Sequence, residues 1–362
     1  MIPVTKPYLP DRRSLDRYLG SIYETSQLTN NGPLVQELTR RLAQYLHVDP
    51  NRLVLVANGS LALQLTYKAL ELTGDVLTTP FSFVASASTL LWEGITPRFV
   101  DVDATSWNMN EQYISEHITS KTKAIMPVHV FGNPCRVDQI GELAKANNLS
   151  LVYDASHCFG VTVSGKSVLD YGDASTLSFH ATKLFHCVEG GAVVARDAAL
   201  AEKIKRLANF GINENGLIER VGVNAKLSEM HAAMGLAVLD DIDEILAARA
   251  ECWEFYESQL DGLVEFQCRS AQASNNYAYF PVLLESEPQV VRLVDELKAR
   301  DIHARRYFYP SLDSVECLQG ESDCIESKRI SCRILCLPIY PSLPQAVQIE
   351  IVNCIREVLG SS

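Results

Sequence analysis

Residues 53–79 read LVLVANGSLALQLTYKALELTGDVLTT. Two strand candidates, Leu53–Val56 and Val76–Thr79, flank a loop and the amphipathic stretch Leu61–Leu72, and the first of them is apolar throughout. Short continuous apolar runs bounded by turn residues are typical of strands that helices cover on both faces. A strand, a helix and a second strand in this order form the unit of a parallel sheet. The stretch therefore predicts an α/β fold.

The same alternation continues as far as residue 195. Further strands are predicted at Arg98–Val102, Ala124–Val128, Leu149–Tyr153, Ala174–Ser178 and Ala192–Ala195. Helices are predicted between the earlier strands, at Val84–Trp92, Glu111–His117 and Val137–Asn147. We therefore expect a large domain with a mainly parallel, seven-stranded sheet and helices on both sides of it.

The pattern changes beyond two further helices. These are predicted at Ala198–Asn209 and, as a long helix, from Leu227 to about Leu260. They are followed by a strand-like segment and two helices, at Asn276–Leu284, Gln289–Arg300 and Gln345–Leu359. We predict a division into a large α/β domain, residues 1–244, and a smaller α+β domain, residues 245–362.

Composition narrows the class of protein. The 362 residues carry a net charge of -12, which argues against nucleic acid as a partner, because phosphate backbones require a basic surface. The N-terminal MIPVTKPYLPDRR lacks the apolar core of a signal peptide, and no apolar run approaches the length of a membrane span. The ten cysteines form no C-x-x-C pair, so we expect reduced, mostly buried thiols in a cytoplasmic protein.

The most specific segment is Ser178-Phe-His-Ala-Thr-Lys183, which follows a predicted strand and precedes the pair Gly190-Gly191. A lysine that forms a Schiff base with a cofactor must lose its proton, and such a setting suits it. The alternative is a solvated lysine at the end of a strand.

Asp154 stands at the C-terminal end of an apolar segment, where open parallel sheets place their ligand-binding groups. A buried carboxylate here could keep the pyridine nitrogen of pyridoxal 5'-phosphate (PLP) protonated, as the chemistry of that cofactor requires. The alternative is an aspartate that caps the next turn.

Asn58-Gly59-Ser60 lies between the first strand and its helix. A glycine and a hydroxyl at a helix N-terminus can bind phosphate through free backbone N–H groups, although Ser60 could equally be an ordinary N-cap. An anion cradle, a strand-end carboxylate and a later lysine together favour a PLP site more strongly than each does alone.

With these segments the chain resembles the DegT/DnrJ/EryC1/StrS family of sugar aminotransferases, which share the PLP-dependent fold type I of aspartate aminotransferase. The likeness runs nearly end to end. Beyond the segments above, it includes Thr29–Pro33, Thr79–Ala85, Phe99–Asp103, Pro127–Gly132, Tyr153–His157, Gly222–Glu229 and Arg305–Pro310.

The resemblance implies a role for each matching residue. Lys183 would carry PLP and move the proton, and Asp154 would hold the pyridine nitrogen. The other cofactor contacts would be Gly59, Ser60 and Ser178 at the phosphate, Phe83 on the ring, His157 beside the phenolic oxygen, and Asn224 reaching the phosphate in the neighbouring subunit. The last role implies a homodimer with shared active sites. Substrate contacts would come from His180, Arg305, Arg306 and Tyr309.

The resemblance also implies a reaction. L-Glutamate would donate an amino group to C4 of dTDP-4-keto-6-deoxy-D-glucose, for the sugars of surface polysaccharide or O-antigen. The chain departs from many relatives at Lys226, where they have Arg, and at Asp313, where they have His; both departures bear on the sugar.

Alternatives remain open. One is a C3-aminating enzyme or a different nucleotide, and another is a PLP-binding regulatory protein. The intact Lys183 and Asp154 and the lack of a basic segment count against the regulatory protein. His186, Cys187 and Glu189 are close in sequence, but three possible ligands on one turn do not make a metal site, and we expect no metal.

Overall fold

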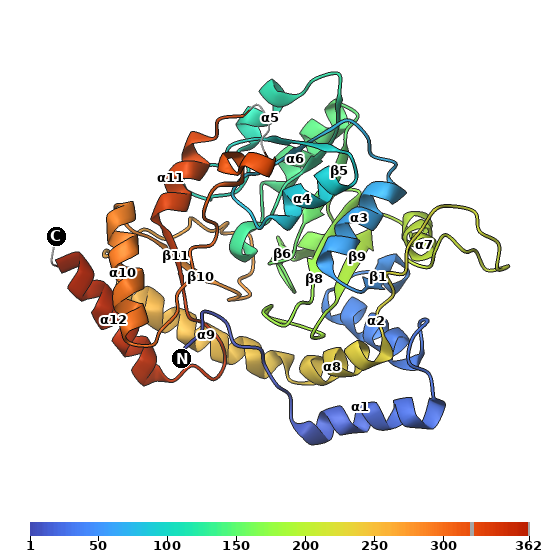
Figure 1. Ribbon diagram of the computed structural model, residues 1–362, viewed down its shortest axis with the longest axis horizontal. Coiled ribbons are helices and arrows are strands. Elements are labelled where there is room, and N and C mark those ends of the chain that lie inside the picture. The colour runs from blue at the N-terminus through green and yellow to red at the C-terminus, as the bar shows by residue number, and fades with distance from the viewer. Residues whose placement is uncertain (319–321, 361–362) are drawn as a thin grey trace.

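The structure is a computed structural model that describes residues 1–318 and 322–360. Its centre is a seven-stranded sheet in the order β1-β9-β8-β5-β4-β2-β3 (Figure 1). The strands are β1 (Leu53–Val56), β2 (Asp75–Thr78), β3 (Thr96–Phe99), β4 (Thr122–Met126), β5 (Ser150–Asp154), β8 (Ala174–Ser178) and β9 (Gly191–Ala195). Only β9 runs antiparallel to its neighbours in this sheet. The predicted α/β fold with a mainly parallel sheet is confirmed.

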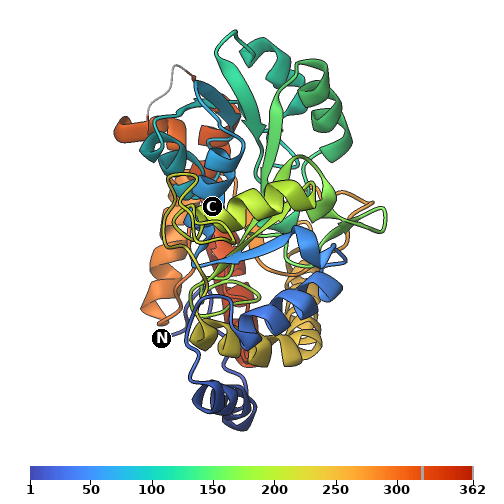
Figure 2. The ribbon, with the colours of Figure 1, turned by 90° about the vertical axis from the view of Figure 1, so that its right-hand side faces the viewer.

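Helices cover both faces of the sheet, because consecutive residues of a strand such as β1 are apolar and point to opposite faces. In β1, Leu53 and Leu55 enter a core shared with α2 (Pro33–Tyr45), α6 (Val137–Ala146) and α8 (Glu229–Asp240). Val54 and Val56 enter a second core on the other face with α3 (Gly59–Ala69) and α7 (Ala198–Leu207). Figure 2 shows the sheet between these layers. α4 (Ala85–Trp92) and α5 (Glu111–His117) complete the large domain's predicted helices.

The prediction of one long helix from Leu227 to about Leu260 is wrong. It consists of α8 and α9 (Ile242–Leu260), separated at Asp241, whose φ of -104° and ψ of 11° are not helical. The Asp241 carboxylate accepts a 3.0 Å hydrogen bond from the hydroxyl of Tyr8. α9 begins in the core of the large sheet and ends in a separate C-terminal core, so it links the two.

The C-terminal core surrounds a two-stranded antiparallel sheet of β10 (Phe280–Leu283) and β11 (Ile334–Leu337). α10 (Glu287–Ala299) and α12 (Gln345–Gly360) pack around it, and α11 (Ile325–Arg333) precedes β11. The strand predicted from Asn276 begins only at Phe280. The buried Asn276 amide instead donates to the carbonyl oxygens of His157 and Phe159, which takes this segment out of the sheet.

The N-terminal residues lie beside this C-terminal core in Figure 1. Ile2 forms a bridge with Ile302, and the N–H of Ile339 donates to the carbonyl of Val4. The division at residues 244 and 245 stays a prediction, and it falls in the first turn of α9.

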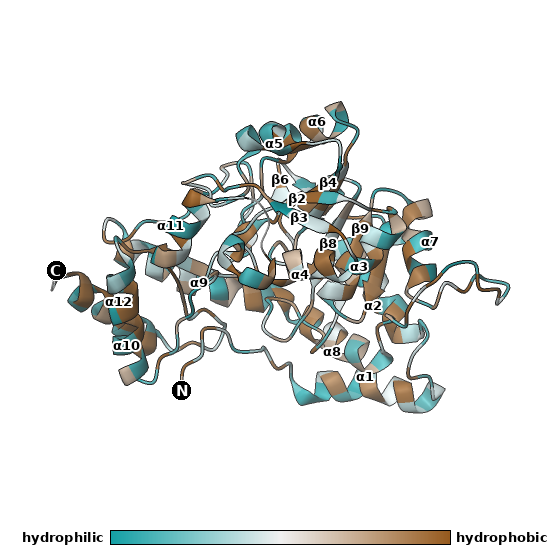
Figure 3. Ribbon diagram, turned by 45° about the horizontal axis from the view of Figure 1, so that its top comes forward, coloured by the Kyte–Doolittle hydropathy of each residue, from teal (hydrophilic) through white to brown (hydrophobic). Residues whose placement is uncertain are grey.

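Sequence reasoning missed several elements: α1 (Arg12–Thr25), α2, the hairpin of β6 (Thr162–Val163) and β7 (Lys166–Ser167), α11 and β11. α1 lies along the edge of the molecule against α8 and alternates between hydrophilic and hydrophobic residues (Figure 3). None of the helices in residues 1–318 and 322–360 is long and apolar enough to cross a membrane.

Candidate active site

A cavity of about 510 Å³ opens where β5 and β8 end, between the large sheet and the C-terminal core. Asp154 is the last residue of β5, and Ser178 is the last residue of β8. Nine of the twelve predicted site residues line this cavity: Gly59, Ser60, Phe83, Asp154, His157, Ser178, His180, Lys183 and Arg305. Eight of them lie at or shortly after the ends of strands of the large sheet, which meet at one edge, whereas Arg305 comes from the C-terminal part of the chain.

Asp154 is buried, and both of its carboxylate oxygens are held. Oδ2 accepts a 2.9 Å hydrogen bond from the hydroxyl of Ser86 in α4. Oδ1 accepts from the hydroxyl of Ser156 at 2.6 Å and from its backbone N–H at 3.1 Å. The carboxylate is therefore fixed in direction at the floor of the cavity.

Lys183 enters the same cavity from the loop after β8. Its Nζ donates a 3.3 Å hydrogen bond to the hydroxyl of Tyr279. Burial lowers the pKa of Lys183, and the nearby negative charge of Asp154 opposes that shift. A lowered pKa increases the share of the amine that is unprotonated. The unprotonated nitrogen is the nucleophile that reacts with an aldehyde.

His157 is neutral. Burial holds its pKa well below the ordinary value, and Lys183 adds to this effect. Its Nδ1 accepts a 3.2 Å hydrogen bond from the backbone N–H of Phe131, so Nε2 carries the proton. A neutral imidazole with a defined donor suits a position beside a phenolic oxygen.

The loop before α3 is closed tightly against the ends of β8 and β9. A Cβ atom on Gly59 would come within 2.9 Å of the Cβ of Ser178, and one on Gly191 would come within 2.5 Å of the Asn58 carbonyl carbon. The helix cap is Asn58, whose Oδ1 accepts from the N–H of Leu61 at 2.9 Å; Ser60 as the N-cap is wrong. In the described part of the chain, the N–H groups of Gly59 and Ser60 have no partner, so they are available to an anion.

These groups fit PLP. The start of α3 with Ser178 would hold its phosphate, Asp154 its pyridine nitrogen and Lys183 its aldehyde carbon. Phe83, 52% exposed in the cavity, leaves a ring free to stack on the cofactor.

Two predicted substrate residues lie outside the cavity. Arg306 turns into the C-terminal core, where it pairs with Glu287 at 2.7 Å and donates to the carbonyl of Cys332 at 2.9 Å. Its guanidinium carbon lies 3.5 Å from the ring centre of Tyr309. These contacts favour a structural role for Arg306, and its role in substrate binding stays a prediction, as does that of Tyr309.

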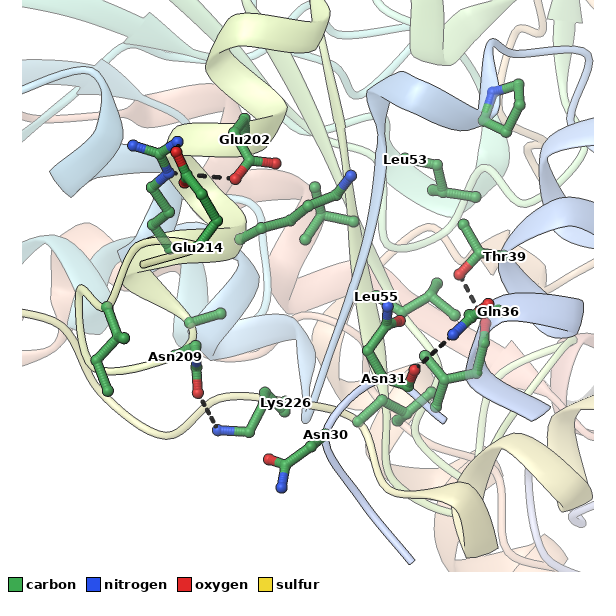
Figure 4. Close-up of a pocket in the computed structure, with 18 of the residues that line it drawn as sticks. Asn30, Asn31, Gln36, Thr39, Leu53, Leu55, Glu202, Asn209, Glu214 and Lys226 are labelled. Carbon is green, nitrogen blue, oxygen red and sulfur yellow. Dashed lines mark hydrogen bonds and ion pairs between the residues drawn. The ribbon is translucent and has the colours of Figure 1, made fainter. Parts of the chain in front are cut away.

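Asn224 is also outside this cavity. It lies exposed on the segment that follows α7, where it forms a bridge with Asn209. Lys226, two residues later, lines a second cavity of about 690 Å³ and donates a 2.8 Å hydrogen bond to Asn209 (Figure 4). Asn30 and Asn31 also line this second cavity, and Figure 4 draws them together with Lys226.

The departure at Asp313 does not face the active-site cavity. Its carboxylate is buried, lies 3.1 Å from Nζ of Lys328 and accepts a 3.1 Å hydrogen bond from the N–H of Cys324. The aspartate therefore holds the segment before α11, and it bears less directly on the sugar than the sequence indicated.

The polar residues of this site that sequence reasoning missed include Ser86, Ser156, Tyr279 and Tyr307. Ser86 and Ser156 contact Asp154, whereas the two tyrosines come from the C-terminal part of the chain. The sequence of the predicted strand Asn276–Leu284 does not indicate that Tyr279 contacts Lys183, almost a hundred positions earlier.

The fold and this site together define a PLP-dependent aminotransferase of fold type I. The chain belongs to the DegT/DnrJ/EryC1/StrS aminotransferase family, which it matches over residues 11–356. It is 41% identical to the dTDP-4-amino-4,6-dideoxy-D-glucose transaminase of Shigella dysenteriae, over 98% of each chain. An Escherichia coli enzyme of the same name is 35% identical, over 97% of each chain. The crystal structure of DesI with its TDP-sugar product superposes with a TM-score of 0.93 at 33% identity, covering 99% of this chain and 93% of DesI.

Proposed function

We propose that this aminotransferase transfers an amino group from L-glutamate to C4 of dTDP-4-keto-6-deoxy-D-glucose, which gives the 4-amino-4,6-dideoxy sugar nucleotide. The observation that carries the proposal is the near full-length likeness to two transaminases named for that product. The likeness to DesI, whose structure contains a TDP-sugar product, supports the same substrate class.

The chain's own residues supply the proton transfers. PLP, when bound, supplies the electron sink that stabilises the negative charge left on carbon when a proton departs. Nζ of Lys183 would take the α-proton from glutamate and, in the second half of the reaction, return a proton to the sugar. Asp154, held by Ser86 and Ser156, would keep its charge directed at the pyridine nitrogen.

Arg305 is the residue we propose for the negative charge of the substrates. Its guanidinium carbon lies 4.6 Å from the ring centre of Tyr307, within the cavity lining. No carboxylate among the described residues pairs with it. A free guanidinium suits a diphosphate or a carboxylate, because it offers paired N–H donors in a planar fork.

The homodimer with shared sites is likewise a proposal. The segment between α7 and α8 exposes large apolar side chains: Phe210 (49%), Leu217 (63%), Ile218 (77%) and Val221 (95%). Such a group of exposed apolar side chains is typical of a protein interface. Asn224 lies in the same segment, three residues after Val221, as a residue that reaches into a neighbouring subunit would.

We further propose that the product serves the synthesis of surface polysaccharide and that the enzyme is cytoplasmic, where nucleotide sugars are made. Neither point adds to the chemistry of the site.

The test is incubation of the PLP-loaded enzyme with glutamate and a panel of keto-sugar nucleotides, followed by NMR of the products. The panel contains 4-keto and 3-keto sugars on dTDP and on GDP. A 4-amino product from the dTDP-4-keto sugar alone supports the proposal. A 3-amino product, or preference for GDP, would reassign the substrate, and no transamination of any sugar would favour a regulatory protein.

A further inference from the structure

Tyr279 brings a hydroxyl from the C-terminal part of the chain to the nitrogen of Lys183. It is the residue before β10, its side chain is 7% exposed, and its oxygen lies 3.3 Å from Nζ. We infer that Tyr279 is a positioning residue that holds the free amine of Lys183. The inference rests on the role proposed above for Lys183 as the cofactor lysine.

The plane of the phenol is fixed by the aromatic rings around it. The ring centre of Tyr279 lies 4.5 Å from that of His157, 5.6 Å from that of Phe131 and 5.8 Å from that of Tyr307. Contacts on several sides leave the ring little freedom to turn, so the hydroxyl keeps its direction. Burial raises the pKa of Tyr279, and the phenol therefore stays neutral and serves as a hydrogen-bond partner.

The backbone before Tyr279 is held by a buried arginine. Arg249, in α9 and 3% exposed, donates from Nη1 to the carbonyl oxygens of Tyr277 and Ala278, at 3.2 Å each. Tyr277 has a φ of +55°, a conformation that tyrosine rarely adopts without support. Burial lowers the pKa of Arg249 to about 10.

No carboxylate among the described residues pairs with Arg249, although a buried cation is costly to place. The two hydrogen bonds from Arg249 fix the backbone just before Tyr279. We therefore infer that Arg249 is also a positioning residue. It holds the backbone, and the backbone sets the orientation of the Tyr279 phenol.

Lys183 needs such a partner because its amine is free for part of each cycle. A neutral amine has two N–H bonds and one lone pair. One N–H donated to the oxygen of Tyr279 leaves the lone pair to accept a proton, and the phenol is unchanged when that proton is passed on. An oxygen acceptor also favours the ammonium form over the amine, so removing it should lower the pKa of Lys183 further.

The test is Tyr279→Phe, which keeps the ring and removes the oxygen. The full-length protein, freed of PLP, is labelled with trace acetic anhydride across a range of pH, and the labelling of Lys183 is measured by peptide mass spectrometry. We expect the pKa of Lys183 to fall by about one unit. The control is Tyr256→Phe, since Tyr256 donates its hydroxyl to the Pro338 carbonyl in the same C-terminal core, away from the cavity.

In the loaded enzyme, Tyr279→Phe should lower turnover ~10-fold with little change in KM for glutamate. An unchanged pKa of Lys183 in Tyr279→Phe, or an equal shift in Tyr256→Phe, overturns the inference. Arg249→Lys is the second variant, for use if the first does not fold: it keeps the charge, loses the fork to the two carbonyls and should shift the pKa in the same direction. The labelling uses no sugar and no donor, so a wrong substrate would leave this result intact.

Discussion

The hydroxyl of Ser86, in the first turn of α4, donates a 2.9 Å hydrogen bond to Oδ2 of Asp154 at the end of β5. A second serine, Ser82, lies 2.8 Å from the Ser86 hydroxyl and extends the chain of hydroxyls. The carboxylate is thus oriented by neighbouring elements of the fold before any ligand arrives. Such preorganisation lets a charged group act without first rearranging.

Asp154→Asn should therefore remove the charge at nearly constant shape. We expect turnover to fall at least ~100-fold, or about 2.7 kcal/mol of transition-state stabilisation, while the cofactor still binds. Steady-state kinetics and cofactor content measure the two effects. Ser86→Ala keeps the charge and loses only its orientation, so its loss should be much smaller. Near wild-type turnover in Asp154→Asn would contradict the assigned role.

Lys183→Ala should abolish turnover and leave the fold intact, because Lys183 supplies the nucleophile that faces the cavity. In the wild type, borohydride should attach the pyridoxyl group to Lys183, as peptide mapping would show. Attachment to Lys166 or Lys226 instead would mean that the cofactor lysine is misassigned.

Substitutions of Arg305 and Arg306, which are adjacent in the sequence, should have different effects. Arg305→Gln should raise KM for the sugar nucleotide ~10-fold or more, because it removes the unpaired guanidinium of the cavity. Arg306→Gln should lower the thermal midpoint with little change in KM, since Arg306 is engaged with Glu287 and backbone carbonyls. Equal changes in KM for both variants would show that Arg306 also contacts substrate.

Mixed dimers test the shared site. If Asn224 serves the neighbouring subunit, Lys183→Ala and Asn224→Ala chains should complement each other, because a mixed dimer contains one site with both residues. Subunits are exchanged in mild denaturant, and activity should rise toward half of wild type per heterodimer. The Asn224→Ala homodimer must itself be strongly impaired. No recovery, with heterodimers seen by native mass spectrometry, would assign Asn224 to its own subunit.

Acid should destabilise the fold through His129. Burial lowers the pKa of this histidine from 6.5 to about 3. The folded chain keeps this imidazole neutral and the unfolded chain protonates it, so its contribution is present above pH 6.5 and is lost as the pH falls toward 3. His129→Gln should flatten the pH dependence of the unfolding free energy near pH 5 by about 1.4 kcal/mol per pH unit. Urea unfolding between pH 5 and 8 measures this slope, which should match the wild type above pH 7. An unchanged slope near pH 5 would contradict a buried, neutral His129.

The sequence alone determined the central sheet and pointed to the main residues that we propose for the cofactor. Apolar runs such as Leu53–Val56 are short and bounded by polar turns, so they predict strands without knowledge of their neighbours. Asp154, Lys183 and Gly59 were identifiable because each stands at or shortly after the end of a strand, and the carboxyl ends of parallel strands meet at one edge.

The tertiary structure alone decided which side chains face one another across the cavity. Tyr279 contacts Lys183, and Arg306 turns away although it follows Arg305 directly, because the packing of the C-terminal core against the large sheet sets both directions. The break between α8 and α9 at Asp241 likewise lies beside Tyr8, far away in sequence. Local propensity carries no information on such contacts, because their free energy arises only when distant segments meet.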